Sequence, residues 1–112
     1  MNNKLMAENR CYACGFELRD YPYDPVHLTP NHEVICSSCG IHYGYDDDGG
    51  GDIIPDELTY SDWKFGDENH VKIMKSWRQH WIDGGMKWWS TESKPKNWNP
   101  KMQLGRIPEG FK

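Results

Sequence analysis

The chain has 112 residues, enough for one domain with a small core, and six Trp and six Tyr must supply much of that core. It contains no run of roughly 20 apolar residues that could span a membrane, and it does not begin with a signal-peptide pattern, so we expect a cytoplasmic protein. The net charge of −4 hides an asymmetry, because residues 1–66 carry 4 basic and 12 acidic side chains (−8), whereas residues 67–112 carry 9 and 5 (+4).

Two Cys-x-x-Cys pairs come first along the chain, Cys11 with Cys14 and Cys36 with Cys39, each followed directly by glycine. Each pair places two thiolates on one tight turn, and two such turns can surround one ion with four sulfurs. In a reducing compartment such pairs favour metal over disulfides. The sequence therefore predicts one structural Zn²⁺ bound by these four cysteines.

Iron is the alternative metal, because rubredoxin-like electron carriers use the same turns. Such chains are about half as long and tend to carry proline in the second pair, where this sequence has Ser37 and Ser38. Four cysteine ligands also leave no open coordination position, so the metal is predicted not to be catalytic. His42, close to the second pair, is interpreted as a strand residue near the site and not as a ligand.

Short apolar segments flank the second pair, and we expect residues 33–35 and 41–45 to form a β-hairpin. The tight turn that carries Cys36 and Cys39, here called a knuckle, would lie at its tip. This predicts a zinc ribbon over residues 10–45. Residues 46–66 follow as an acidic loop and connector.

The acidic loop contains Asp46, Asp47, Asp48 and Asp52 around three glycines, a composition that disfavours both helix and strand. We predict that these four carboxylates bind a basic protein partner, with a merely solvated loop as the plainer alternative. Residues 46–57 also fit part of a calcium-binding template, although Gly50 stands where an oxygen ligand is expected.

From residue 67 the apolar period becomes that of a helix, with Val71, Met74, Trp77 and Trp81 on one face. Asp67 is a suitable N-cap and the following Gly-Gly pair a suitable stop, so the sequence predicts a helix over 67–83.

A second, shorter helix is predicted to open at Asn99 and Pro100, as N-cap and first helical position, and to end at Gly105. A nucleic-acid-binding zinc-ribbon module, which would bind through Lys87, Lys94, Lys96 and the nearby Trp residues, is an alternative function. The acidic residues 1–66 disfavour this function, because they would repel the phosphates of a nucleic acid.

Together these segments predict an α+β fold with a single domain over 1–112, in which the zinc ribbon packs against a Trp-rich helical half at 67–112. No G-x-S-x-G motif and no phosphate-binding glycine loop occur, and every cysteine is assigned to metal. We therefore predict that the protein is not an enzyme.

Both knuckles with their glycines, the acidic run after Tyr45, and the segment 81–89 (Trp-Ile-Asp-Gly-Gly-Met-Lys-Trp-Trp) are similar to small cysteine-rich zinc-ribbon proteins of bacteria. Over roughly residues 11–104 the chain resembles the cysteine-rich CPCC-type family encoded near polymorphic toxins. The resemblance implies an immunity protein that binds and blocks a toxin. An acidic surface would accelerate its association with a basic toxin domain.

Overall fold

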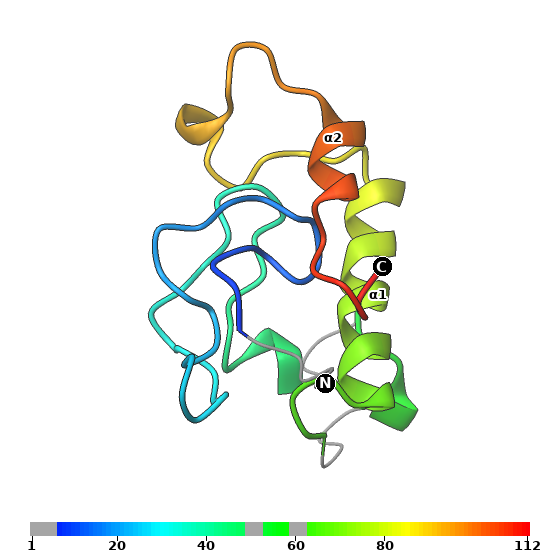
Figure 1. The fold of residues 1–112 in the computed structure, drawn as a ribbon. Helices are drawn as coiled ribbons and strands as arrows, with labels where there is room; N and C mark the ends of the chain where they lie inside the picture. The colour runs from blue at the N-terminus through cyan, green and yellow to red at the C-terminus, as the bar shows by residue number, and fades with distance from the viewer. Residues whose placement is uncertain (1–6, 49–52, 59–62) are drawn as a thin grey trace.

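The computed structural model describes residues 7–48, 53–58 and 63–112. Its elements are two α-helices and three short 3₁₀-helices: η1 (Asp46–Asp48), η2 (Asp56–Leu58), α1 (Glu68–Asp83), η3 (Thr91–Ser93) and α2 (Pro100–Gly105). Figure 1 shows the irregular N-terminal half lying along one side of α1, with α2 near the C-terminal end of that helix. The protein is thus a four-cysteine N-terminal part joined to a mostly helical C-terminal part.

The predicted β-hairpin of the ribbon is wrong for the part of the chain that the structure describes. That part contains only isolated antiparallel bridges, one of which joins Ile35 to His42. The ladder stops there because the backbone N–H groups of Tyr45 and Asp46 turn back to the carbonyl of His42, at 3.2 and 2.9 Å. The chain therefore curls into η1, and the β component of the predicted α+β class is reduced to single bridges.

Helix α1 confirms the predicted helix and its cap. The side chain of Asp67 accepts the N–H of His70 at 2.9 Å, and the N–H of Gly84 closes the last turn on the carbonyl of His80. Ile73 and Trp81 are buried, so the helix contributes an apolar face to the core. No helix within the described ranges is long and apolar enough to cross a membrane.

Aromatic rings form the centre of the core. Tyr12 contacts Phe111 edge to face, with ring centroids 4.7 Å apart, and Tyr23 contacts Tyr43 in the same way at 5.2 Å. All four rings are buried. Because a buried tyrosine must still satisfy its hydroxyl group, each Tyr here has a polar partner: the N–H of Glu8 for Tyr12, Asp47 for Tyr23 and the sulfur of Cys11 for Tyr43.

Helix α2 joins the C-terminal part to the second cysteine pair. Its predicted cap is confirmed, since the Asn99 side chain accepts the N–H of Met102 at 3.2 Å. Gln103, buried on this helix, donates to the Ser38 hydroxyl at 2.9 Å and accepts from the Trp98 indole at 2.7 Å. This short helix is therefore anchored to the N-terminal half.

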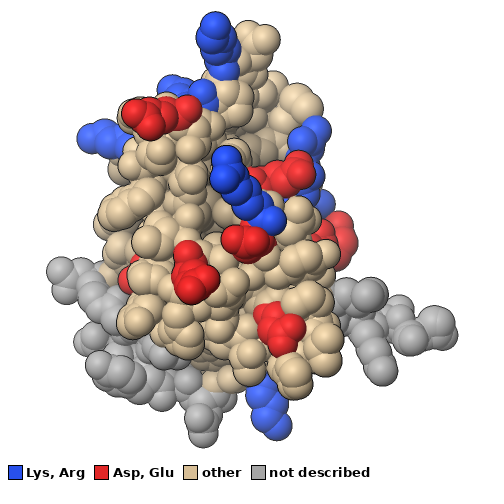
Figure 2. Space-filling view, turned by 90° about the vertical axis from the view of Figure 1, so that its left-hand side faces the viewer, with Lys and Arg blue, Asp and Glu red and all other residues tan. Residues whose placement is uncertain are grey.

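Charges of both signs share the molecular surface. Figure 2 shows the side away from α1, where acidic side chains are spread out with basic ones between them. The strong acidity of the first 66 residues in the sequence therefore does not gather into one continuous patch on this face.

Candidate metal centre

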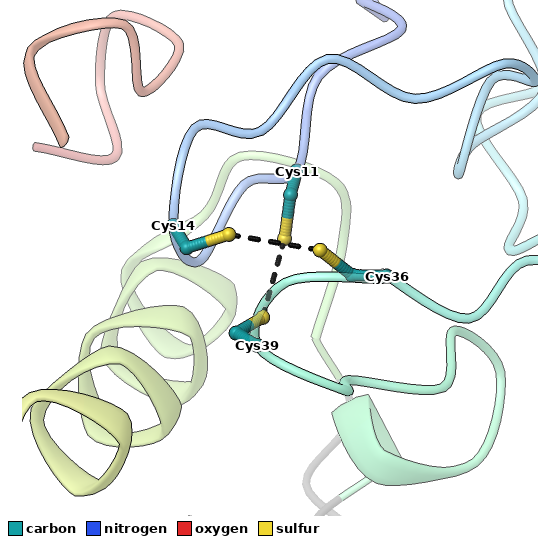
Figure 3. Close-up of side chains that lie close together, drawn as sticks. All are labelled: Cys11, Cys14, Cys36 and Cys39. Carbon is teal, nitrogen blue, oxygen red and sulfur yellow. Dashed lines mark hydrogen bonds between the residues drawn. The ribbon is translucent and has the colours of Figure 1, made fainter. Parts of the chain in front are cut away.

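The side chains of all four cysteines converge on one buried point (Figure 3). Their sulfurs lie within 4.8 Å of one another, with Cys11 to Cys39 and Cys14 to Cys36 both at 3.6 Å. A disulfide would require about 2.05 Å. A tetrahedral ion with metal–sulfur bonds of about 2.3 Å separates its sulfurs by about 3.8 Å. The predicted grouping is confirmed, and the four thiols are positioned to bind one metal ion, zinc or iron.

The first knuckle (residues 11–16) presents Cys11 and Cys14 through a tight turn. The N–H of Cys11 donates to the carbonyl of Phe16 at 2.8 Å, and the N–H of Gly15 donates back to the carbonyl of Cys11 at 2.9 Å. Gly15 adopts φ +86°, a conformation that glycine takes at little cost.

The second knuckle (residues 36–41) repeats that arrangement. The N–H of Cys36 donates to the carbonyl of Ile41, and the N–H of Gly40 donates to the carbonyl of Cys36, both at 2.9 Å. Gly40 has φ +80°. The glycine after each pair is thus explained by the turn, and the two knuckles meet as near-copies around one point.

Arg78, on α1, caps the first knuckle. Its Nε donates to the carbonyl of Ala13 at 2.6 Å, and one Nη donates to the carbonyls of Tyr12 at 3.2 Å and Phe111 at 2.6 Å. Arg78 was not predicted as part of the site. Its position four residues after Met74, beside the buried stripe, was the available signal.

Backbone N–H groups cap the second knuckle at the equivalent two positions. Trp89 donates to the carbonyl of Ser38 at 3.0 Å, and Ser90 donates to the carbonyl of Ser37 at 2.8 Å. The chain segment after α1 therefore closes the second knuckle, as Arg78 closes the first.

Tyr43 reaches the centre directly. Its hydroxyl donates to the sulfur of Cys11 at 3.1 Å and accepts the N–H of Tyr12 at 3.0 Å. Burial, together with the negative charge of Cys11, raises the pKa of Tyr43 well above its ordinary value. The phenol therefore keeps its proton and remains a hydrogen-bond donor to sulfur.

The cysteines differ in how easily they lose a proton. Burial works against a charged Cys11, but hydrogen bonds from the other three cysteines and from Tyr43 outweigh it and hold the pKa of Cys11 well below the usual value. Burial and the interaction with Cys11 raise the pKa values of Cys36 and Cys39. Four thiolates so close together need a cation between them, which is the donor chemistry of a structural metal site.

Two of the acidic residues predicted to bind a partner serve internal hydrogen bonds. Asp47 is fully buried and accepts from the Tyr23 hydroxyl and the Gly44 N–H, both at 2.9 Å. Asp46 is half-buried and accepts the N–H of His42 at 2.7 Å. The expectation of a solvent-facing carboxylate is therefore corrected for Asp47.

The other predicted acidic positions are not placed by the structure. The side chain of Asp48 and the whole of Asp52 lie outside the described residues. Among the described residues, the four cysteines are the one group of metal-ligating side chains that comes together. The calcium-loop alternative thus gains nothing from Asp46, Asp47 and Glu57.

His42 is not a ligand of the centre. Its Nε2 donates to the backbone carbonyl of His32 at 2.7 Å. The interpretation of His42 as a neighbour of the site holds, although it lies in a single bridge and not in a strand.

A chain of buried polar side chains, which was not predicted, joins α1 to η1. Gly66 N–H donates to Nδ1 of His70 at 2.9 Å, so His70 Nε2 carries the proton and donates to the Tyr23 hydroxyl at 2.8 Å. Tyr23 in turn donates to Asp47. Burial lowers the pKa of His70 to about 3, and Trp63 stacks on its ring at 4.1 Å. His70 is therefore a neutral core residue at physiological pH.

Comparisons of the chain with protein-family models, with curated proteins and with solved structures find no match. The resemblance to CPCC-type proteins therefore depends on the sequence motifs alone. The function has to be argued from the centre and the surface around it.

Proposed function

We propose that this protein is a non-enzymatic, zinc-stabilised module that binds another protein, and specifically an immunity- or antitoxin-type inhibitor of a bacterial toxin. The supporting observation is the closed four-sulfur centre. Its ligands are buried, and four thiolates complete a tetrahedron without a position for water or substrate. The metal would then fix an irregular half of the molecule whose outer surface does the binding.

Zinc is proposed over iron because Ser37 and Ser38 replace the proline typical of rubredoxin-like knuckles, and because the chain is about twice the length of such proteins. Elemental analysis of protein purified without added metal tests this choice. Zinc protein should be colourless. A red protein whose visible absorption bleaches on reduction would instead establish the electron-carrier alternative.

A groove of about 570 Å³ beside the second knuckle supplies the surface that we propose for the partner. Arg19 is the one cation among its lining residues, and Ile35, which is 40% exposed, provides an apolar contact. Four exposed carboxylates line it: Glu17, Asp20, Glu33 and Glu92. Such a groove suits a Lys- or Arg-rich segment of a partner, which it would attract at long range.

The groove replaces the acidic loop as the centre of the proposed interface. Asp46 and Asp47 are occupied inside the fold, and the acidic side chains of the face in Figure 2 are dispersed. The carboxylates that line the groove are therefore a better candidate for the partner interface than the acidic side chains of residues 1–66 as a whole.

Co-purification with the product of the adjacent gene, followed by affinity measurement at two salt concentrations, tests this proposal. Replacing three of the four groove acids together (Asp20→Asn, Glu33→Gln, Glu92→Gln) should weaken binding by about 10-fold or more, because charge complementarity is lost. It should also flatten the dependence on salt.

A matched control removes three carboxylates that do not line the groove (Glu57→Gln, Asp83→Asn, Glu109→Gln). The net charge changes equally, so this variant should bind within about 2-fold of the unmodified protein. Equal losses in both variants, or an affinity independent of salt, would contradict the groove as the interface.

Nucleic-acid binding is the second candidate, and one cavity favours it. This cavity of about 280 Å³ lies between the first knuckle and α2 and is lined by Phe16, Trp98, Arg10 and Arg106, among others. The ammonium of Lys94 lies 4.9 Å from the ring centroid of Trp98. An aromatic ring with cations around it is the usual combination for a single-stranded base and its phosphate.

Fluorescence anisotropy with a labelled single-stranded oligonucleotide at low salt separates the two candidates. Under the protein-binding proposal, the oligonucleotide should not bind at protein concentrations up to tens of micromolar. Dissociation constants of about that size are typical of non-specific nucleic-acid binding. Micromolar binding that Trp98→Ala and Arg106→Gln abolish would replace our proposal with the nucleic-acid one.

A further inference from the structure

The two knuckles match in their backbone but differ in what surrounds them. The carbonyls of Ser37 and Ser38 are satisfied by neutral backbone N–H groups, whereas those of Tyr12 and Ala13 are satisfied by the guanidinium of Arg78. In the first knuckle, the Tyr43 hydroxyl also donates a hydrogen bond to the sulfur of Cys11. Within the described residues, no side-chain hydroxyl or cation donates a hydrogen bond to the sulfurs of the second knuckle, although the charge of Arg78 acts on Cys39 as well as on Cys11 and Cys14.

We propose that Tyr43 and Arg78 are positioning residues of the metal centre, which stabilise the Cys11 thiolate and its knuckle so that this knuckle is the last to release the metal. The inference rests on the metal centre proposed above and is independent of the partner. It assigns the stability of metal binding to two residues that are not ligands.

The hydroxyl of Tyr43 acts on the electron density of sulfur. A hydrogen bond to a thiolate disperses its negative charge, which lowers its reactivity toward electrophiles and fixes its orientation toward the ion. Tyr43 is well placed for this because its ring is fully buried, packs edge to face on Tyr23, and has its oxygen held by the Tyr12 N–H. The donor therefore requires little reordering to meet the sulfur of Cys11.

Arg78 acts through charge and through the backbone. A divalent ion with four thiolates leaves a net charge of about −2 in a buried site, where an opposite charge is worth more than in water. The guanidinium also binds the carbonyl of Phe111, so it ties the first knuckle to both α1 and the C-terminal segment. Among the described residues, no cation binds the backbone of the second knuckle, and the charge of Arg78 acts there only on Cys39.

Cys39 is the ligand that we expect to react first. Its residue is 9% exposed, whereas Cys11, Cys14 and Cys36 are completely buried. Exposure and the lack of a hydroxyl donor therefore both point to the second knuckle as the weaker side of the centre.

The order in which the cysteines react tests the proposal on the unmodified protein. Metal-loaded chain is treated with limiting N-ethylmaleimide, and the modified residues are identified by mass spectrometry after proteolysis. Cys39 should be alkylated first and Cys11 last. Alkylation of Cys11 before or together with Cys39 would overturn the proposal.

Tyr43→Phe tests the hydroxyl, with Tyr23→Phe as its control. Both variants lose one buried hydroxyl, but Tyr23 donates to Asp47 and not to sulfur. In Co²⁺-loaded protein, Tyr43→Phe should shift the sulfur-to-metal charge-transfer band, and it should transfer metal to EDTA about 10-fold faster. Tyr23→Phe should leave the band in place, and an equal shift in both variants would refute the role of Tyr43.

Arg78 is tested by two replacements. Arg78→Lys keeps the charge but loses the planar fork, and Arg78→Gln loses both, so metal transfer to EDTA should accelerate in the order Arg, Lys, Gln. Unchanged rates in Arg78→Gln would refute its role.

The inference fails separately from the proposed function. If elemental analysis finds no metal, the metal centre itself is wrong. If metal is bound but the alkylation order and the transfer rates show no difference between the knuckles, only this inference is wrong. Should Tyr43→Phe not fold, the alkylation order of the unmodified protein still decides.

Discussion

The two halves of this molecule satisfy their backbones in different ways. Helix α1 uses its own hydrogen bonds and is closed by Asp67 at its start and Gly84 at its end. The knuckles have only isolated bridges and turns, and donors from far along the chain complete them. An element with internal hydrogen bonds needs the rest of the molecule chiefly for burial. The knuckles need it for their hydrogen bonds as well, and they need a cation between their sulfurs.

Metal removal should have the largest effect, because the knuckles depend on the ion and α1 does not bind it. Structural zinc contributes on the order of 10 kcal/mol or more to small domains. Because the cysteines and α1 share one core cluster, chelation or Cys36→Ser should unfold both halves together. Loss of dispersion in amide NMR spectra and of the thermal transition checks this. A chelated protein with an unchanged spectrum would show that the knuckles hold without metal, and Ser37→Ala serves as a control that retains all four ligands.

The next largest effect should come from Gly15→Ala. A Cβ at Gly15 would clash with the carbonyl oxygen of Gln103, in addition to the strain of φ +86°. At Gly85, with φ +96°, a Cβ would meet nothing within 4 Å. We expect Gly85→Ala to lower the free energy of unfolding by about 1–2 kcal/mol and Gly15→Ala by at least about 3 kcal/mol. Denaturant titration measures both, and equal costs would mean that the contact between the first knuckle and α2 is loose.

Acid should destabilise the fold through His70. Burial lowers its pKa from 6.5 to about 3, so the unfolded chain binds more protons than the folded one between these values, and stability must fall as pH drops below about 6.5. Between pH 7 and pH 5 the loss should be about 2 kcal/mol. Nitrogen-15 NMR should show His70 neutral at pH 5, whereas a His70 signal that titrates near pH 6.5 would contradict its burial.

The smallest of these effects should come from the helix cap. Asp67→Ala removes the acceptor for the N–H groups of His70 and Lys64, at 2.9 and 2.7 Å, and should cost about 1 kcal/mol. Glu68→Ala removes only an exposed pair with Lys72, which should cost well under 1 kcal/mol. Denaturant titration measures the free energy of unfolding of both variants. Equal losses in Asp67→Ala and Glu68→Ala would mean that α1 does not begin at this cap.

The elements that were predicted correctly are those specified by residues close together in the sequence. Two Cys-x-x-Cys pairs with following glycines, and a capped apolar stripe after Asp67, each specify their own geometry within a few residues. The knuckles and both helices were therefore predicted close to where they lie. The spacing of the cysteines was enough to identify all four ligands of the site.

What the sequence could not predict depends on partners far along the chain. Asp47 reads as part of a solvated loop until Tyr23 and the His70 chain are placed against it. Arg78 reads as a surface charge until the first knuckle is brought beneath it. The hairpin was expected from two short apolar segments, of which Val34, Ile41 and Tyr43 are buried, but the pairing ends because the chain turns back at His42.

The long-range caps have a consequence for how the molecule is made in the cell. Arg78 and Ala13 are 65 residues apart, as are Gln103 and Ser38. The cysteines therefore emerge from the ribosome well before the residues that enclose them. During that interval their thiols remain open to oxidants and to competing ions, and contacts of such separation form slowly. We therefore expect the metal centre to be fully enclosed only after synthesis has passed α2.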